Sequence, residues 1–397
     1  MTRPDTSDGA ISALPFKIYK MTLEQLTSLG MLNKCTIECT KQSRWKEATQ
    51  RYIANMLINN VKLQDDVLDK KYHVMPTIDF MLNERGHIRH IEAPVVRDRV
   101  VQKSLMKNVL IPAIRPYLIY DNYASLTDRG TSFARKRFEI MLRRYVSHYG
   151  TKGYILLIDI TKYFENVDHD VLKQLITPRI HNEPDDIVNL IYYIIDSSSK
   201  TKKGLNLGSE DPQIFAVYYL NLIDVFIKVV KSVKFYGRYM DDIFVIHNSK
   251  KYLTGLLYEI EEKLLELKLT VNERKTHIVK LGHGFTFLQV KYNIKPTGKI
   301  LKRMSHGKVH RQRRRLRAFR RMLDKNKMTE GEILNCYKSW RGTVIHDHNA
   351  CYKTIKNMDA LFAKLFPDCK PDKQLTRSEI ATNIYKMASF NELKYIV

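Results

Sequence analysis

The sequence predicts an α+β fold built around a four-stranded, ferredoxin-like sheet, and three observations carry this prediction. The run Tyr154–Ile158 is continuously apolar between Gly153 and Asp159, which is typical of a buried strand. Residues 233–247 hold two runs rich in β-branched and aromatic residues, which predict a hairpin. Helix-like segments separate and follow these runs, and the resulting β-α-β-β-α-β order places the first strand beside the central hairpin.

Each element follows from the local pattern of apolar residues. Residues 51–150 mix helix-like segments with a strand pair at 77–82 and 87–93, where Gly86 favours a tight connection. The elements expected after residue 150 are a strand at 154–159, helices within 167–198 and at 212–230, the hairpin at 233–247, a helix at 250–268, and strands near 276–281 and 284–295. Residues 302–323 predict a basic helix with one apolar face.

We expect four regions along the 397-residue chain, which is long enough for two or three domains with their own cores. They are an N-terminal extension (1–50), a mixed region with the strand pair (51–150), the region of the predicted sheet (151–300), and a basic helical region with a C-terminal tail (301–397). The tail beyond residue 370 predicts one more helix.

The charge balance predicts a polyanionic partner. The chain holds 67 Lys and Arg against 42 Asp and Glu, a net charge of +25. A membrane surface is the rival partner, but we see no run of 18 apolar residues and the N-terminus is polar, so no membrane binding is expected. The five cysteines are odd in number and sparse, which favours a reduced, cytoplasmic protein. Zinc bound by Cys336, His346, His348 and Cys351 is a less favoured alternative to simple packing.

Two adjacent carboxylates, Asp241 and Asp242, occupy the tip of the predicted hairpin, where Asn-Gly or Asp-Gly is usual. Like charges repel, so the pair is costly unless a divalent cation neutralises it. A solvated turn would be the purely structural explanation. Asp159 favours chemistry instead, because it stands at the carboxyl end of a buried strand, where ligands bind in sheet-based enzymes. If the two strands are neighbours, the three carboxylates converge.

Three carboxylates on neighbouring strand ends can hold two Mg²⁺ ions, with Mn²⁺ as a substitute. Such a pair aligns an attacking 3′-hydroxyl with an α-phosphate and stabilises the leaving pyrophosphate. The basic helix at 302–323 has ten Lys and Arg and no acid, so it favours a phosphate backbone over its weaker alternative, an anionic membrane. The nucleic-acid contacts that we expect there are Lys308, Arg311, Arg314, Arg315 and Arg321. Together these features predict nucleotidyl transfer.

Five motifs in order resemble those of reverse transcriptases. They are Asp159-Ile-Thr-Lys-Tyr-Phe164, Gly204 to Asn221, Tyr239-Met-Asp-Asp242, Leu269 to Thr276, and Phe285 to Val290. The resemblance spans most of residues 80–350 and implies an RNA-directed DNA polymerase. It also implies a right-hand polymerase fold, with fingers (51–150), a ferredoxin-like palm (151–300) and a helical thumb (from 301).

The resemblance also implies roles for individual residues. Asp159 and Asp241 would bind both metals together with the carbonyl of Ile160, and Asp242 would help to hold the site. Phe164 would exclude a ribose 2′-hydroxyl. The remaining dNTP-binding positions would be Arg89, Arg129, Gln213 and Lys275, and the primer grip would comprise Tyr239, Met240, Phe287 and Leu288. Surface ion pairs for the two arginines and simple packing for Met240 are the alternatives.

Departures from the family pattern bear on the biological role. Most members end the second motif with Ser-Pro, whereas this chain has Pro212-Gln213; a terminal Gln resembles diversity-generating retroelements and defence-associated bacterial lineages. Pro212 breaks the Ser-Gln signature of the mutagenic class, so antiphage defence is favoured over diversification. Gln289 replaces the usual glycine of the primer-grip turn.

The expected partners are a structured, non-coding template RNA, the cDNA product and dNTPs. An accessory protein or a second copy of the chain stays open as a further partner. The primer is not defined, and a tyrosine hydroxyl is one candidate. An RNA polymerase with the same palm and a catalytically silent RNA-binding scaffold are the alternatives to reverse transcription. The first usually carries Asp where Phe164 stands, and the intact carboxylates argue against the second.

Overall fold

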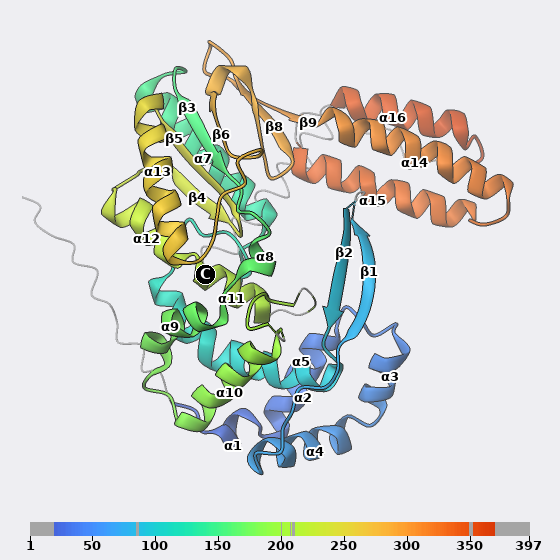
Figure 1. Ribbon diagram of the computed structural model, residues 1–397. Helices are drawn as coiled ribbons and strands as arrows, with labels where there is room; N and C mark the ends of the chain where they lie inside the picture. Colours follow the sequence, from blue (N-terminus) through green and yellow to red (C-terminus); the bar gives the residue numbers. More distant parts are fainter. Residues whose placement is uncertain are drawn as a thin grey trace, which may run out of the picture. The chain divides into compact units, whose positions relative to one another are not determined.

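The computed structural model describes residues 20–84, 87–199, 201–206, 208, 211–348 and 352–369. The chain divides into two compact units, which are described one at a time. The first comprises residues 1–118 and 164–221, and the second comprises 119–163 and 222–397. The four-region division along the sequence stays a prediction. Figure 1 labels the elements.

The first unit begins with helices that pack around α5. These helices are α1 (Leu23–Leu26), α2 (Leu29–Thr40), α3 (Glu47–Ala54), α4 (Met56–Leu68), α5 (Val96–Leu105), η1 (Met106–Leu110), α6 (Ile111–Ile114) and η2 (Arg115–Tyr117). Leu32, Leu63 and Val100 are fully buried among them. Buried Asn60 is satisfied by Asn33 at 2.8 Å and Thr36 at 3.1 Å, so a polar contact ties α4 to α2.

A two-stranded antiparallel hairpin precedes α5, formed by β1 (Ile78–Glu84) and β2 (His87–Ala93). This confirms the predicted strand pair, with β1 extending two residues further than expected. The connection at residues 85–86, including Gly86, lies outside the described residues. Phe80, Met81 and Ile88 are exposed, so the hairpin presents apolar side chains to its surroundings.

The rest of the first unit is helical, as expected for residues 167–198. Its helices are α8 (Tyr163–Asn166), α9 (His169–Ile180), α10 (Asp185–Ser197) and α11 (Asp211–Tyr219). Asp168 caps α9 by accepting the Val171 N–H at 3.0 Å. The apolar positions of α10, such as Ile187, Ile191 and Ile194, recur at helical spacing and are buried.

The second unit contains the predicted sheet. Its strands are β3 (Tyr154–Ile158), β4 (Tyr236–Tyr239), β5 (Asp242–His247) and β6 (His277–Lys280). They are antiparallel in the order β4-β5-β3-β6, which is the ferredoxin-like order, so β3 lies beside β5 as predicted. The last β3–β5 pair is Ile158 with Ile243, which brings the end of β3 to the start of β5.

Helices and a second sheet complete the core of this unit (Figure 1). They are α7 (Thr131–Tyr149), α12 (Asn221–Val225), η3 (Phe226–Val230), α13 (Lys250–Glu266), η4 (Leu281–His283), β7 (Phe285–Phe287), β8 (Val290–Ile294) and β9 (Ile300–Met304). Phe138 of α7 contacts Phe244, Phe287 and Tyr292, with ring centroids 4.7, 4.7 and 4.9 Å away. One aromatic cluster thus joins α7 to both sheets.

The β7–β8 turn is tight although it lacks the glycine of the family pattern. Leu288 and Gln289 have φ of 43° and 67°, the left-handed values that a two-residue hairpin turn requires. Arg135 donates to the Leu288 carbonyl from Nε at 3.3 Å and Nη2 at 3.1 Å. This buried guanidinium supports a backbone conformation that is unfavourable for residues with a Cβ.

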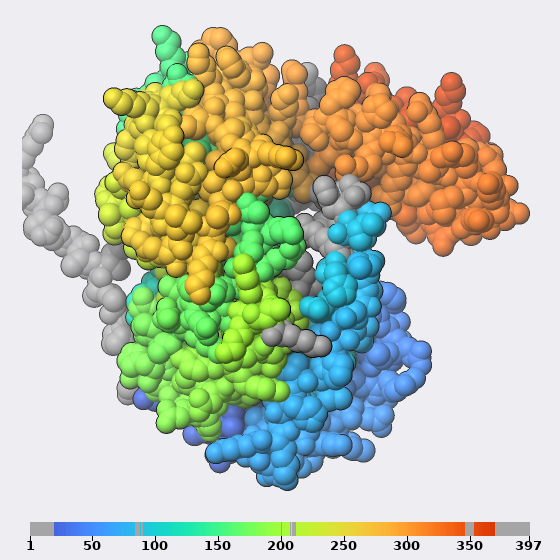
Figure 2. All heavy atoms as spheres, in the orientation of Figure 1, coloured from blue at the N-terminus to red at the C-terminus, as the bar shows by residue number. Residues whose placement is uncertain are grey.

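Three helices form a separate bundle at the end of the described chain, which Figure 2 shows in orange and red. They are α14 (His306–Asp324), α15 (Glu330–His348) and α16 (Tyr352–Leu365), packed through a core that includes Leu316, Tyr337 and Phe362. The helix predicted at 302–323 begins only at His306. Residues 300–304 pair with β8 instead, and Lys302 forms an ion pair with Glu139 at 2.9 Å. The helix expected beyond residue 370 lies outside the described residues.

One helical run among the described residues is long and apolar enough to cross a membrane by length and composition. It is Pro212–Val230, with 19 residues and a mean hydropathy of 1.6. From the sequence we expected no such stretch, because Asn221, Asp224 and Lys228 interrupt its apolar residues. Of its most apolar window, 61% is buried inside the structure. Core helices of globular proteins meet the same criteria.

Candidate active site

The β4–β5 hairpin closes with a two-residue turn, Met240-Asp241, because Tyr239 pairs with Asp242. Met240 has φ of 52°, which is unusual for a residue other than glycine. Such conformations cost on the order of 1–3 kcal/mol and cluster at functional sites. The turn therefore presents Asp241 from a backbone that needs support from its surroundings.

Asp159 directly follows β3, and the segment 270–276 holds its backbone. The Asn272 N–H donates to the Asp159 carbonyl at 2.7 Å, and the Asp159 N–H donates to Thr276 Oγ1 at 3.3 Å. Ile160 is buried and forms an isolated bridge with Val271. Two segments more than 100 residues apart in sequence are thus fastened together at the carboxyl end of β3.

This fastening brings Lys275 to Asp159. The Lys275 Nζ lies 3.0 and 3.1 Å from the two carboxylate oxygens of Asp159. The lysine side chain is 64% exposed and that of Asp159 is 18% exposed. The structure therefore unites two residues that the sequence assigned to one site from separate motifs.

The three carboxylates share one electrostatic environment. Burial, together with the negative charges of Asp241 and Asp159, raises the pKa of Asp242 to about 7, although the charge of Lys275 acts in the opposite direction. A carboxyl group with this pKa is half protonated near neutrality, because the surrounding groups do not compensate its charge. Such a cluster attracts cations.

The donor set fits Mg²⁺, although it is not a closed metal cage. No three His, Cys, Asp or Glu side chains within the described ranges are grouped tightly enough to ligate a metal by themselves. Mg²⁺ is usually held by one or two carboxylates, with waters and substrate phosphates completing its shell. An open, all-oxygen group that repels its own charges suits this ion. The zinc alternative is not tested, because the side chains of His346 and His348, and Cys351, lie outside the described residues.

Replacing Asp242 with Asn is expected to stabilise the metal-free protein at neutral pH. The raised pKa means that the folded state binds this proton more tightly than the unfolded state. The resulting stability is present below pH ~4, the unfolded-state pKa, and is lost as the pH rises to about 7. The unfolding free energy of D242N should therefore exceed that of the parent by up to about 4 kcal/mol above pH 7.

Urea unfolding in EDTA at several pH values between 4 and 8 measures this difference. Asp65→Asn on the exposed surface of α4 is the matched control and should run parallel to the parent. A D242N curve that also runs parallel to the parent would contradict the uncompensated charge.

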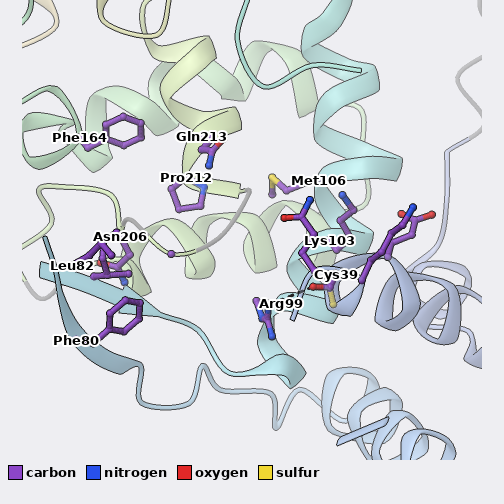
Figure 3. Close-up of a pocket in the computed structure, with 15 residues that line it drawn as sticks. Cys39, Phe80, Leu82, Arg99, Lys103, Met106, Phe164, Asn206, Pro212 and Gln213 are labelled. Carbon is purple, nitrogen blue, oxygen red and sulfur yellow. Dashed lines mark hydrogen bonds between the residues drawn. The ribbon is translucent and has the colours of Figure 1, made fainter. Parts of the chain in front are cut away.

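The first unit contributes a cavity of about 620 Å³ with two of the predicted dNTP-binding residues, Phe164 and Gln213, in its wall. Figure 3 shows Pro212 and Gln213 at the start of α11, with Phe80 and Leu82 of β1 also lining the cavity. Its basic wall is formed by Lys41, Arg99 and Lys103. The last two lie four residues apart on α5. This spacing of four residues indicates that the two cations share one helix face, so it could have predicted a basic wall here from the sequence.

The family model described as "Reverse transcriptase (RNA-dependent DNA polymerase)" matches residues 81–301, which is more than half of the chain. The chain belongs to the reverse transcriptase family. This match confirms the predicted right-hand polymerase fold, and the family's description is that of the predicted enzyme class, an RNA-directed DNA polymerase.

Two solved structures similar to this reverse transcriptase are of apo telomerase from Candida tropicalis. The form truncated of its C-terminal domain has 13% sequence identity and a TM-score of 0.44, with 62% of this chain and 60% of that chain covered. The other form has 13% identity and a TM-score of 0.44, covering 77% of this chain and 62% of that one. This chain thus spans roughly three fifths of the telomerase chains that it matches. A search of curated proteins finds no match.

Of the two arginines predicted to clamp a triphosphate, the structure describes the side chain of one, Arg129. Arg129 lies over the rings of Tyr120 and Phe133, at 4.7 and 4.6 Å from their centroids, and donates to the Tyr120 carbonyl. These contacts hold the Arg129 guanidinium in place against neighbouring residues of the protein. Arg89 pairs with Leu82 through the β1–β2 register, and its side chain is outside the described part of the structure.

Three of the four predicted primer-grip residues come together in the second unit. Phe287 and Leu288 are buried in the cluster around Phe138, and Tyr239 packs against the same cluster. Met240 is half-buried on the turn before Asp241. A direct contact of these residues with a primer stays a prediction.

The predicted thumb carries exposed cations along α14. Arg311, Arg314 and Arg321 are exposed; Arg315 is also exposed and lies over the Phe319 ring at 5.0 Å, and Lys308 is partly buried. A hollow of about 380 Å³ opens next to the first turns of α14. Its basic lining residues, which the sequence analysis did not select, are Arg303, His306, His310, Arg313 and Lys353. Arg303 lies on β9 and Lys353 on α16, so a pattern within the basic helix alone does not select them.

Proposed function

We propose that this protein copies an RNA template into DNA by two-metal nucleotidyl transfer at Asp159, Asp241 and Asp242. One observation carries the proposal. Burial and the neighbouring Asp241 and Asp159 raise the pKa of Asp242 to about 7, so the three carboxylates form an anionic site that Lys275 compensates only in part. A site of this kind at the end of a ferredoxin-like sheet is suited to divalent cations that also bind a triphosphate.

Different residues of the palm have different roles in the proposed reaction. When bound, the two Mg²⁺ ions lower the pKa of the 3′-hydroxyl and neutralise charge on the phosphates. Asp159 and Asp241 would hold the ions with the carbonyl of Ile160, and Asp242 would support them. Lys275 lies 3.0 Å from Asp159, so its ammonium group is placed close enough to the carboxylates to meet phosphate oxygens of a bound triphosphate.

The thumb supplies binding to the template–product duplex. Exposed arginines of α14 offer cations to the phosphate backbone, and the hollow beside them adds Arg303 and Lys353. These contacts are independent of sequence, which suits a polymerase that must move along its template.

The proposed activity is tested by primer extension. The purified protein should incorporate dNTPs on a primed RNA in Mg²⁺, with Mn²⁺ as a substitute, and should lose all incorporation in EDTA. Binding to RNA that weakens steeply with salt but is never accompanied by incorporation would support the scaffold alternative. Incorporation of rNTPs in preference to dNTPs would support an RNA polymerase.

Replacing Phe164 with Ala is expected to relax sugar selection. Phe164 lines the cavity in the first unit, where its ring can exclude a ribose 2′-hydroxyl. The efficiency of rNTP incorporation relative to dNTP should rise about 10- to 100-fold. Phe80→Ala, which removes another ring from the same cavity, is the matched control and should leave this ratio unchanged. Equal effects of both variants would mean that cavity volume, not Phe164, sets the preference.

For the biological role we propose synthesis of cDNA from a dedicated, structured non-coding RNA in bacterial antiphage defence, in the cytoplasm. Pro212-Gln213 supports this lineage, and the four cysteines within the described residues are free thiols. Gln213 lines the cavity, which favours mutagenic synthesis in a diversity-generating retroelement as the second candidate. Sequencing of the co-purifying RNA and cDNA distinguishes them: one constant product indicates defence, and scattered substitutions relative to the template indicate diversification.

A further inference from the structure

Arg238 is a fully buried arginine in β4, three residues before Asp241. An uncompensated guanidinium in a protein core costs several kcal/mol, so arginines are rarely placed there. None of the proposed catalytic or nucleic-acid contacts uses this side chain. Its partners therefore indicate what the charge does.

Asp224 of α12 neutralises the charge in a two-point contact. Arg238 donates to Asp224 from Nε at 2.8 Å and from Nη2 at 2.5 Å. Asp224 is also fully buried, and the Tyr236 hydroxyl donates to it at 2.5 Å. The planar guanidinium is thus held in one orientation, because both ends of the fork are fixed.

The remaining nitrogen of the guanidinium reaches the catalytic turn. Nη1 donates to the carbonyl of Met240 at 3.0 Å. That carbonyl belongs to the peptide bond between Met240 and Asp241, so its orientation sets the plane of this peptide and hence the direction of the Asp241 backbone. Met240 adopts φ of 52°, a conformation that persists only where surrounding contacts hold it.

The backbone of Arg238 is fixed as well. Its N–H donates to the Asp121 carbonyl at 3.0 Å, and its carbonyl accepts from the Tyr123 N–H at 2.9 Å. The segment 121–123 thereby covers the outer edge of β4. Because backbone and side chain are both held, the bond to the Met240 carbonyl has little freedom to shift.

We propose that Arg238 is a positioning residue, which with Asp224 holds the Met240-Asp241 turn so that Asp241 is presented to the metal ions. This inference rests on the proposed two-metal function. It assigns the buried ion pair a role in metal binding beyond its role in folding. Groups that orient metal ligands typically change metal affinity or activity about 10- to 100-fold when they are removed.

The thumb provides a matched control with the same chemistry. The Tyr337 hydroxyl donates to Asp359 at 2.5 Å, and Arg341 donates to the same carboxylate from Nε at 3.0 Å. This Tyr–Asp–Arg group joins α15 to α16 and contains none of the proposed metal ligands. Loss of an ion pair as such should therefore affect both groups, whereas loss of positioning should affect the palm group alone.

The experiment compares the parent with R238M/D224N, R341M/D359N and R238K. Each full-length protein is measured for thermal stability, for Mn²⁺ binding by electron paramagnetic resonance, and for the Mg²⁺ dependence, kcat and dNTP KM of primer extension. The double variants replace each ion pair by neutral groups, so no buried charge is left unpaired. R238K keeps the charge but loses the fork, and it is the variant to rely on if R238M/D224N does not fold.

For R238M/D224N we expect the Mn²⁺ Kd and the half-saturating Mg²⁺ concentration to rise about 10- to 100-fold, with kcat reduced and the dNTP KM at saturating Mg²⁺ little changed. R238K should show a smaller rise, of about 3- to 10-fold. R341M/D359N should lose stability without changing either metal constant. Unchanged metal constants in both Arg238 variants, or equal changes in the thumb variant, would overturn the proposal. An inactive parent would refute the proposed function, while Mn²⁺ binding would still decide the role of Arg238.

Discussion

Asp241→Asn is expected to lower dNTP incorporation by at least about 10³-fold, the largest effect among the changes considered. Asp241 occupies the tip of the β4–β5 turn, and its charge contributes to the raised pKa of Asp242. The amide is nearly isosteric but supplies no negative charge to a cation. Single-turnover primer extension in saturating Mg²⁺ measures the loss, because it isolates the chemical step from binding and release.

A folded protein is required for this result to bear on catalysis. D241N should unfold at the same temperature as the parent or higher, because it removes one of the mutually repelling charges. Asp65→Asn on α4 controls for the loss of a carboxylate elsewhere and should retain full activity. Incorporation by D241N within about 10-fold of the parent would exclude Asp241 from metal binding.

Phe138→Ala is expected to produce the second largest effect, a loss of about 3–5 kcal/mol in the free energy of unfolding. Phe138 is fully buried and its ring meets Phe244 on one sheet and Phe287 and Tyr292 on the other. Removing the ring leaves a cavity between α7 and both sheets. These three parts of the core cannot all move inward to fill it. Denaturant unfolding followed by circular dichroism measures the change.

Two further variants separate the cavity from other causes. Phe138→Leu keeps most of the volume and should cost much less than the alanine change. Tyr258→Ala removes an aromatic ring that is 64% exposed on α13 and should change stability by less than about 0.5 kcal/mol. Equal losses from F138A and Y258A would contradict the central place of Phe138 in the core.

The palm could be predicted from sequence because its strands are short, apolar and joined in a topology with few alternatives. The order of strands and helices was sufficient to place Asp159 beside the Asp241-Asp242 turn, and the structure has the same strand order. In contrast, the predicted start of the basic helix was four residues too early. Residues 300–304 become a strand only because β8 is available to pair with them, and a pattern within one segment does not contain that information.

The buried charges were harder to foresee. Arg238 and Asp224 lie 14 residues apart, one in a strand and one in a mostly apolar helical run. The available signal was that these two mostly apolar segments contain charges of opposite sign. The primer-grip turn is a similar case, since Leu288 and Gln289 adopt left-handed conformations with Arg135 as support from another helix.

The contact between Lys275 and Asp159 determines which cation neutralises this carboxylate before any metal ion binds. In the metal-free protein an internal ammonium group serves as a resident counter-ion for the carboxylate. Because the lysine is largely exposed, releasing it costs no more than about 1 kcal/mol, or roughly a fivefold change in metal affinity. If a metal ion binds at Asp159, this lysine would be released at little cost. Its positive charge would then be available to the negative charges of a triphosphate bound at the same site.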